Sequence, residues 1–255
     1  MMRPIAAATL LLLGLPLAAL ADGLAIPTYH ADYSVTRNSL AIGVAKFTLS
    51  ENADGSYTYQ SVTRPAGVAA LFFSDVVTET THFEVEAGDP RSLLYSFSQT
   101  GGSHEKTETI QFDWQKRAAY TGEDGKNRPT RVEQGTADRF LAQLLISLDA
   151  AAGRSGGQYT VLDHHELTTY SLSLQPPAKL HTPAGEFDVV VLERKDAAKG
   201  RVMDFWLAPQ LHYLPVQLQQ RETDKATITL TLTDIGFDTA APAAASTAPK
   251  QAGAD

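Results

Sequence analysis

The one cluster of histidines in the sequence is His164-His165-Glu166. These side chains could ligate a metal ion, with His181 or His212 brought in by folding as a further ligand. Adjacent residues on a strand point to opposite faces, so His164 and His165 cannot both reach one ion unless the chain turns there. The spacing also lacks the regular intervals of zinc sites. The sequence therefore favours a structural or solvated role for this cluster and predicts no metal site.

Acid–base chemistry would need two carboxylates brought together in space. Asp113, Glu186, Asp188 and Asp204 could form such a pair, but a chain with 29 acidic residues offers many candidates of this kind. Nucleophilic catalysis has less support, because there is no cysteine, no serine elbow between a strand and a helix, and no glycine-rich phosphate loop. We therefore predict no catalytic residue and no cofactor, and expect a protein that is not an enzyme.

An apolar run, Val68–Phe73, follows Arg64-Pro65-Ala66-Gly67 at a connection between predicted strands, where polar turn residues are usual. It could be a loop packed against the core. Alternatively it could be a lid over an apolar cavity or a docking patch for a hydrophobic partner. Trp114 and Trp206 could likewise either fill the core or line a pocket. The candidate ligand-binding residues are Leu71, Phe72, Phe73, Trp114, Trp206 and Tyr213.

Charge and composition exclude several functions. The formal net charge is −8 and the chain has no basic run, which argues against nucleic acid and against electrostatic binding to anionic membranes. With no cysteine there is no lipidation site and no disulfide, so a lipoprotein is excluded and stability must come from a core.

Both ends of the chain are expected to lie outside the folded domain. Arg3, the apolar run Ile5–Leu20 and the small residues Ala19-Leu20-Ala21 predict a cleaved signal peptide at 1–21, too short and interrupted for a transmembrane anchor. Residues 238–255 are rich in alanine and proline and are predicted to be disordered. We therefore expect one domain at 22–237 and a periplasmic location.

The dominant pattern between the ends is alternation with a period of two, which predicts an all-β fold. The segment Leu180–Gln220 is the clearest case, because Thr182-Pro183-Ala184-Gly185 predicts a turn and Val189–Leu192 a buried strand. Roughly a dozen strands at this spacing are typical of a large curved antiparallel sheet or an open β-barrel or half-barrel. One amphipathic α-helix is predicted at about 136–151, capped by Thr136 and laid against the sheet.

Several short motifs carry a family resemblance. They are Ile42-Gly43, Phe112-Asp113-Trp114, Thr182–Phe187, Phe205–Pro209 and Tyr213–Val216. In these the chain resembles the exported bacterial family called domain of unknown function 3108 (DUF3108). The resemblance implies an envelope protein with a large antiparallel sheet, similar more distantly to the half-barrels that shuttle lipoproteins across the periplasm. The family has no established chemistry, so the resemblance implies no catalytic residue.

Two functions follow as hypotheses. The first is a non-enzymatic periplasmic binding or carrier protein, which holds a lipid or acylated ligand on the concave face of the sheet, gated by Val68–Phe73 and the 136–151 helix. The alternative is an interaction or scaffold module of the cell envelope, with a filled core, no ligand and a protein partner. A hydrolase is the third and least supported hypothesis.

Overall fold

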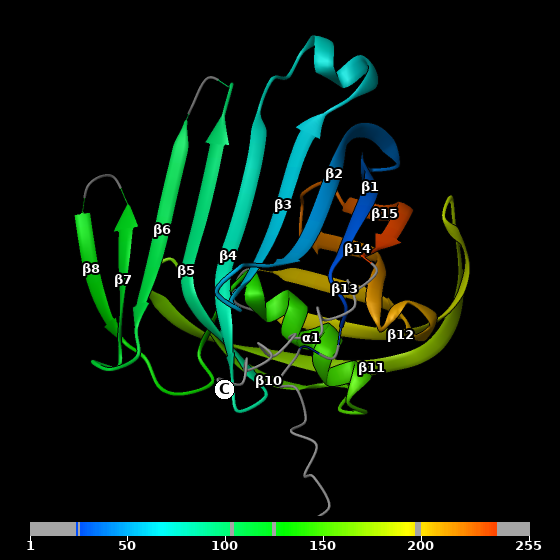
Figure 1. Ribbon diagram of the computed structural model, residues 1–255. Coiled ribbons are helices and arrows are strands. Elements are labelled where there is room, and N and C mark those ends of the chain that lie inside the picture. The colour runs from blue at the N-terminus through cyan, green and yellow to red at the C-terminus, as the bar shows by residue number, and fades with distance from the viewer. Residues whose placement is uncertain (1–23, 25, 103–104, 124–125, 197–199, 239–255) are drawn as a thin grey trace, which may run out of the picture.

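The structure is a computed structural model that describes residues 24, 26–102, 105–123, 126–196 and 200–238 (Figure 1). The predicted signal peptide and residues 239–255 of the predicted tail lie outside the described residues. Within the described ranges, no helix is long and apolar enough to cross a membrane.

Fifteen strands form one sheet, more than the dozen expected. They are β1 (Tyr29–Arg37), β2 (Leu40–Glu51), β3 (Tyr57–Pro65), β4 (Val76–Glu86), β5 (Asp89–Thr100), β6 (Lys106–Asp113), β7 (Ala118–Glu123), β8 (Lys126–Arg131), β9 (Ala137–Asp138), β10 (Gly157–Asp163), β11 (Glu166–Thr182), β12 (Gly185–Asp196), β13 (Arg201–Ala208), β14 (Leu214–Glu222) and β15 (Ile228–Phe237). One α-helix, α1 (Leu141–Ala151), and two 3₁₀-helices, η1 (Gly67–Leu71) and η2 (Pro209–Leu211), complete these elements.

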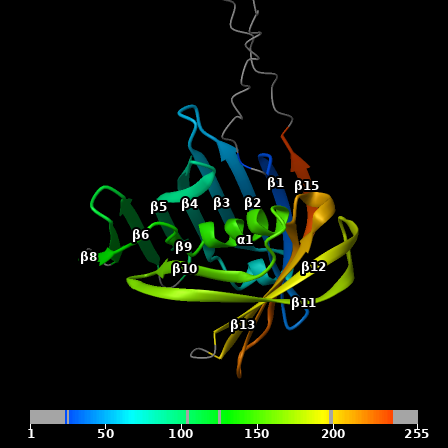
Figure 2. The same ribbon diagram turned by 90° about the horizontal axis from the view of Figure 1, so that it is seen from below.

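The strand order explains how the chain forms a curved sheet. Strands β1 to β8 run outward from the centre as an antiparallel meander. The chain then crosses to the opposite edge, where β9 pairs parallel to β10, and β10 to β15 return as a second meander until β15 pairs with β1. Strand pairing does not close the sheet into a barrel, since β8 and β9 remain edges, but the sheet curls around α1 (Figure 2).

The predicted alternation in β1 and the predicted hairpin after Leu180 are confirmed. Tyr29, Ala31, Tyr33 and Val35 are all buried, and Thr182 pairs with Gly185 across the tight turn between β11 and β12. Strand β11 is the longest of these strands, with 17 residues. It passes Pro176 and Pro177 by a register shift between Gln175 and Ala178, because prolines cannot donate to the ladder.

Gly43 on β2 lies beside a register shift and at a close approach of two backbones. The pairing of β1 with β2 shifts register between Val35 and Thr36, next to the point where Val35 faces Gly43. A Cβ atom at Gly43 would lie 2.5 Å from the backbone oxygen of Arg64 on β3. Only glycine allows the strands to approach so closely.

Helix α1 begins at Leu141, five residues later than the sequence predicted, because Ala137 and Asp138 form strand β9 instead. The capping group is also different: Oδ1 of Asp138, not Thr136, accepts hydrogen bonds from the backbone N–H groups of Phe140 and Leu141, each at 2.8 Å. The helix buries residues on most of its circumference. It is therefore a fixed part of the core and not a gate over the concave face.

Asp138 also joins the edge strand to the opposite half of the sheet. Its Oδ2 accepts hydrogen bonds from Thr81 Oγ1 on β4 at 2.6 Å and from Ser92 Oγ on β5 at 2.7 Å. The residue is fully buried, and this burial, only partly opposed by the hydrogen bonds, raises the pKa of its carboxyl. One side chain thus holds β9, the start of α1 and two distant strands together.

Candidate functional site

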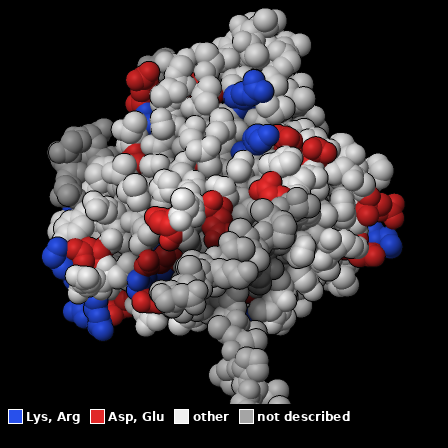
Figure 3. All heavy atoms as spheres, in the orientation of Figure 1, with Lys and Arg blue, Asp and Glu red and all other residues white. Residues whose placement is uncertain are grey.

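The predicted apolar run forms η1 and the two residues after it, and it is not packed against the core. The exposed fractions are 79% for Leu71, 75% for Phe72 and 60% for Phe73. Val68 is equally open at 73%. In Figure 3 the end of the molecule that carries η1 is white, without acidic or basic groups at its tip. The interpretation as a loop tucked into the core is therefore wrong, and the exposed patch (Val68, Leu71, Phe72 and Phe73) is termed the η1 patch below.

The other three predicted ligand-binding residues lie away from this patch. Trp114 follows β6, stacks on Phe112 at 5.4 Å between ring centroids, and donates from its indole N–H to the carbonyl of Ser92 at 2.8 Å. Trp206 on β13 packs against the larger of two core clusters, whereas the adjacent residues Phe205 and Leu207 belong to the smaller one. Tyr213 lies in the connection between β13 and β14, with φ of 59°. The structure does not bring these residues together with Leu71–Phe73.

The chemical candidates from the sequence are also separated. His164 and His165 form the tight turn between β10 and β11, and the described residues contain no group of three or more side chains suited to a metal ion. Three of the predicted acids are paired with cations instead of with each other: Asp113 with Lys116, Asp188 with Lys179 and Asp204 with Arg221. The segment Gly153–Gly157 has the letters Gly-x-Ser-x-Gly but leads from α1 into β10, the reverse of a nucleophile elbow.

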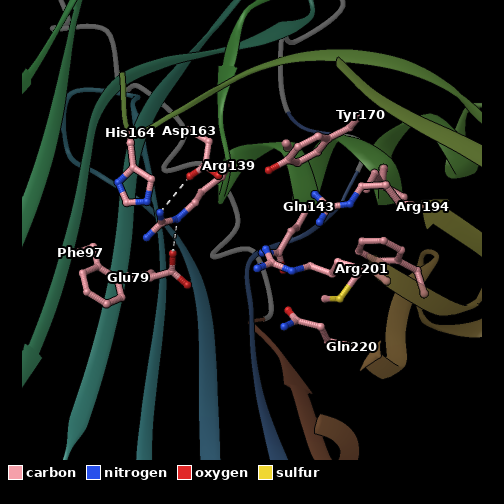
Figure 4. A pocket seen from close by; sticks show the side chains of 14 residues that line it. Glu79, Phe97, Arg139, Gln143, Asp163, His164, Tyr170, Arg194, Arg201 and Gln220 are labelled. Atoms are coloured by element: carbon pink, nitrogen blue, oxygen red, sulfur yellow. Dashed lines mark hydrogen bonds and ion pairs between the residues drawn. The ribbon is translucent and has the colours of Figure 1, made fainter. Parts of the chain in front are cut away.

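Three adjacent hollows lie inside the curved sheet, at the end where η1 lies. The register places the β1–β2, β12–β13 and β14–β15 connections at one end, because Arg37 pairs with Ile228 and Arg201 with Glu222. The first hollow, the polar chamber, has a volume of about 340 Å³ (Figure 4). Its lining comprises Glu79, Phe97, Arg139, Ala142, Gln143, Ile146, Asp163, His164, Tyr170, Arg194, Arg201, Met203, Phe205 and Gln220.

The second and third hollows are less charged. The middle chamber, of about 230 Å³, shares Glu79, Gln143, Met203 and Gln220 with the polar chamber and also has the apolar walls Phe47, Phe140, Leu218, Ile228 and Leu230. The apolar chamber, of about 250 Å³, shares Thr63 with the middle chamber. Its remaining lining is Val35, Arg37, Ile42, Gly43, Arg64, Pro65, Phe73, Asp75 and Val77. The three hollows therefore form a row. Its first member is lined by charged side chains, and its last member reaches the η1 patch at Phe73.

Arg139 organises one wall of the polar chamber. Its Nε donates to Glu79 Oε1 and its Nη1 to Asp163 Oδ1, each at 3.0 Å, while Glu108 Oε2 lies 3.5 Å from Nη1. Burial acts to lower the pKa of this guanidinium, but the surrounding charges, Glu79 and Asp163 among them, outweigh it and raise the pKa above its usual value. Arg139 is thus a permanent cation held by three carboxylates.

Two further groups belong to this wall. Burial, and then the charge of Glu79, raises the pKa of Tyr95, whose hydroxyl donates to Glu79 Oε1 at 2.7 Å. His164 Nδ1 lies 2.9 Å from Glu108 Oε2, without the angle of a hydrogen bond. The acids on this side of the chamber are therefore already engaged with groups of the protein itself.

The opposite wall carries two more arginines, Arg194 on β12 and Arg201 on β13 (Figure 4). The guanidinium carbon of Arg194 lies 3.9 Å from the ring centroid of Tyr170, and the Nε atoms of both arginines are buried without a hydrogen-bond partner among the described residues. The nearest ion pair of Arg201 is a long one, 3.8 Å to Glu222 Oε2. This wall therefore presents two guanidinium groups, each with one buried donor that has no partner among the described residues.

The sequence reasoning missed these charged residues, although part of the signal was present. Glu108 lies two positions before Ile110 on a strand whose odd and even residues alternate between faces, so a shared inward face could have been predicted. Glu79 likewise lies two and four positions before the buried residues Thr81 and Phe83 on β4. No local pattern points to Arg139, because its site is built by three separate strands.

A similar fold is found among known structures. A β-barrel-like protein of domain of unknown function 1849 from Brucella abortus superimposes with a TM-score of 0.56 at 13% identity, covering 85% of this chain and 100% of that chain. A suspected lipoprotein from Parabacteroides distasonis gives 0.35 at 7% identity, covering 84% and 98%. A suspected exported protein with a YmcC-like fold from Bacteroides fragilis gives 0.35 at 9%, covering 83% and 98%. The first similarity supports a barrel-like architecture.

Sequence comparison identifies the family. No curated protein sequence matches the chain. The profile of the family described as "Protein of unknown function (DUF3108)" matches residues 29–233, from the first residue of β1 to within β15. The match covers most of the chain and all but the last few residues of the sheet, which confirms the resemblance found in the short motifs. The chain therefore belongs to the DUF3108 family of proteins of unknown function.

Proposed function

We propose that this protein is a non-enzymatic binding or carrier protein for an acylated, amphiphilic ligand held inside its curved sheet. The observation that carries the proposal is the row of three adjacent hollows, whose lining changes from charged at the polar chamber to apolar beside Phe73. An amphiphile would place its chain against the apolar walls and its polar end among the charged side chains.

Other observations support binding over catalysis. Glu79 and Asp163 are hydrogen-bonded to Arg139, an arrangement that positions both carboxylates and leaves neither free to act as a general acid or base. Arg3, the apolar run Ile5–Leu20 and the small residues before Asp22 support export to the periplasm by a cleaved signal peptide.

The test is native mass spectrometry of the mature protein purified from periplasmic extract, together with titration of a hydrophobic fluorescent probe. We expect a co-purifying small molecule and saturable probe binding. Phe73→Ser should weaken the probe about three- to tenfold, because it removes part of an apolar wall. Phe72→Ser is the matched control, since Phe72 is exposed and lines none of the three chambers. A ligand-free mass together with no probe binding would reject the proposal.

A second candidate function is an interaction module of the cell envelope, favoured by the η1 patch. Four large apolar side chains, each at least 60% exposed, are unusual on a protein that has no partner. A photo-crosslinking residue at Val68 should trap one dominant protein in cells, and the double variant Leu71→Ser, Phe72→Ser should remove that product. Leu174→Ser, at an exposed site on β11, should leave it intact. Unchanged crosslinking in the double variant would exclude the patch as the interface.

A further inference from the structure

The two walls of the polar chamber differ in how well their charges are balanced. Arg139 has carboxylate oxygens of Glu79, Asp163 and Glu108 within 3.5 Å. Arg194 and Arg201 have weaker contacts with carboxylates. The ion pair of Arg201 with Glu222 is long, at 3.8 Å, and the guanidinium of Arg194 lies over the ring of Tyr170, which is uncharged. The wall formed by β12 and β13 therefore holds two guanidinium groups in longer or uncharged contacts, with the carboxylates of Asp196 and Glu222 on the strands beside Arg201.

The sheet register places these two arginines next to each other. Arg194 pairs with Met203, and Arg201 lies two residues before Met203 on the same strand and the same face. They are diagonal neighbours across the two strands, within reach of each other's long side chains. Figure 4 shows both on the same side of the chamber as Gln143 and Gln220, opposite Arg139 and Glu79.

One donor of each arginine is buried and not used. The Nε atoms of Arg194 and Arg201 are shut off from solvent and have no hydrogen-bond partner among the described residues. Buried polar groups in folded proteins almost always have a partner, so two such atoms beside one cavity need an explanation. The guanidinium of Arg194 lies over the Tyr170 ring, with its central carbon 3.9 Å from the ring centroid, and this contact holds the side chain beside the chamber.

We propose that Arg194 and Arg201 bind the anionic head group of the ligand, a carboxylate or a phosphate, with the amides of Gln143 and Gln220 as neutral donors at its edge. This rests on the proposed function, because the acyl chain of the same ligand would occupy the middle and apolar chambers. Paired guanidinium groups recognise both oxyanions through parallel N–H donors, so the shared chemistry is an anion with two or more terminal oxygens. Glu222 and Asp196, which is paired with Arg201 across the strands, limit the charge that the site accepts.

The experiment compares three ligands with the same sixteen-carbon chain: hexadecanoate, hexadecyl phosphate and hexadecanol. Binding is measured by displacement of a hydrophobic fluorescent probe from the mature protein, wild type and the double variant Arg194→Gln, Arg201→Gln. The matched control is Arg117→Gln, Arg131→Gln, which removes two arginines that are both more than 60% exposed. Urea unfolding of each variant checks that the fold is kept.

We expect wild type and the control to bind at least one of the two anions tenfold or more tightly than hexadecanol, and the double variant to lose that preference while hexadecanol binding stays within twofold. Preference for hexadecanoate identifies a carboxylate head group, and preference for hexadecyl phosphate a phosphate. Equal affinity of wild type for all three ligands would overturn the head-group assignment but leave the carrier function standing, and this comparison needs no variant. Binding of none of the three would overturn both proposals.

Discussion

Replacing Asp138 with alanine is expected to lower the free energy of unfolding by about 3 kcal/mol, and the Tm by about 10 °C for a domain of this size. The carboxyl accepts hydrogen bonds from two hydroxyls and two backbone N–H groups, and alanine leaves all four buried donors without this acceptor. It also frees β9 and the start of α1 from β4 and β5. Thermal and urea unfolding, followed by tryptophan fluorescence, measure the loss.

Asp188→Ala is the control, because Asp188 is exposed and makes a surface ion pair with Lys179. It should change stability by no more than about 0.5 kcal/mol. A loss in Asp138→Ala no larger than that of the control would show that the buried network does not hold the edge of the sheet.

Asp138→Asn adds a dependence on pH to the same test. The pKa of this carboxyl is raised in the folded state, chiefly by burial, above the 3.8 of a solvated aspartate. The folded state therefore binds this proton more tightly, and the contribution of Asp138 to stability is greatest at low pH and falls as the pH rises through the folded-state pKa. Wild type should lose stability relative to Asp138→Asn as the pH rises above about 4, until the folded-state pKa has been passed. A difference that stays constant with pH would contradict the raised pKa.

Phe140→Ala is expected to cost about 3 to 5 kcal/mol, because it removes a fully buried ring from the centre of the interior. Phe140 is 1% exposed and stacks on Tyr59, with centroids 4.3 Å apart and planes at 10°, and it contacts Phe47 at 6.0 Å. Its loss would leave a cavity beside the middle chamber, which Phe140 also lines. The midpoint of urea unfolding measures the effect.

The matched control is Phe72→Ala, the same substitution at a residue that is 75% exposed. It should leave stability within about 0.5 kcal/mol of wild type. If both variants lost equal stability, the η1 patch would be part of the folded core and not an exposed surface. The pair therefore also tests the surface on which the second candidate function depends.

Much of the fold was predictable, because strands and turns are indicated by patterns within short stretches of the sequence. Alternation along Tyr29–Val35, the turn at Thr182–Gly185 and the glycine at position 43 each report burial or backbone geometry within a few residues. The family resemblance was carried by equally short motifs. The full length of β11 was not predictable, since the register shift that carries the strand past the prolines at 176 and 177 depends on the partner strand.

The start of the helix was predicted less well. Thr136 is a good capping residue by type, but the tertiary structure pairs Ala137 and Asp138 with β10 and uses the Asp138 carboxyl as the cap. Hydrogen bonds from Thr81 and Ser92, distant in sequence, stabilise that choice. A propensity that favours one residue locally is overridden by contacts that only the folded chain can make.

The sequence by itself determined an all-β chain with one helix, its family, and the absence of cysteine chemistry, because composition and a two-residue period are properties of short stretches. Only the tertiary structure decided that the interior has a charged end. Glu79, Glu108, Arg139 and Asp163 come from three strands and the link between β9 and α1, and they meet because the sheet curls far enough to bring its two meanders together. Curvature of this kind arises from twist summed over many strands, which no single segment of sequence records.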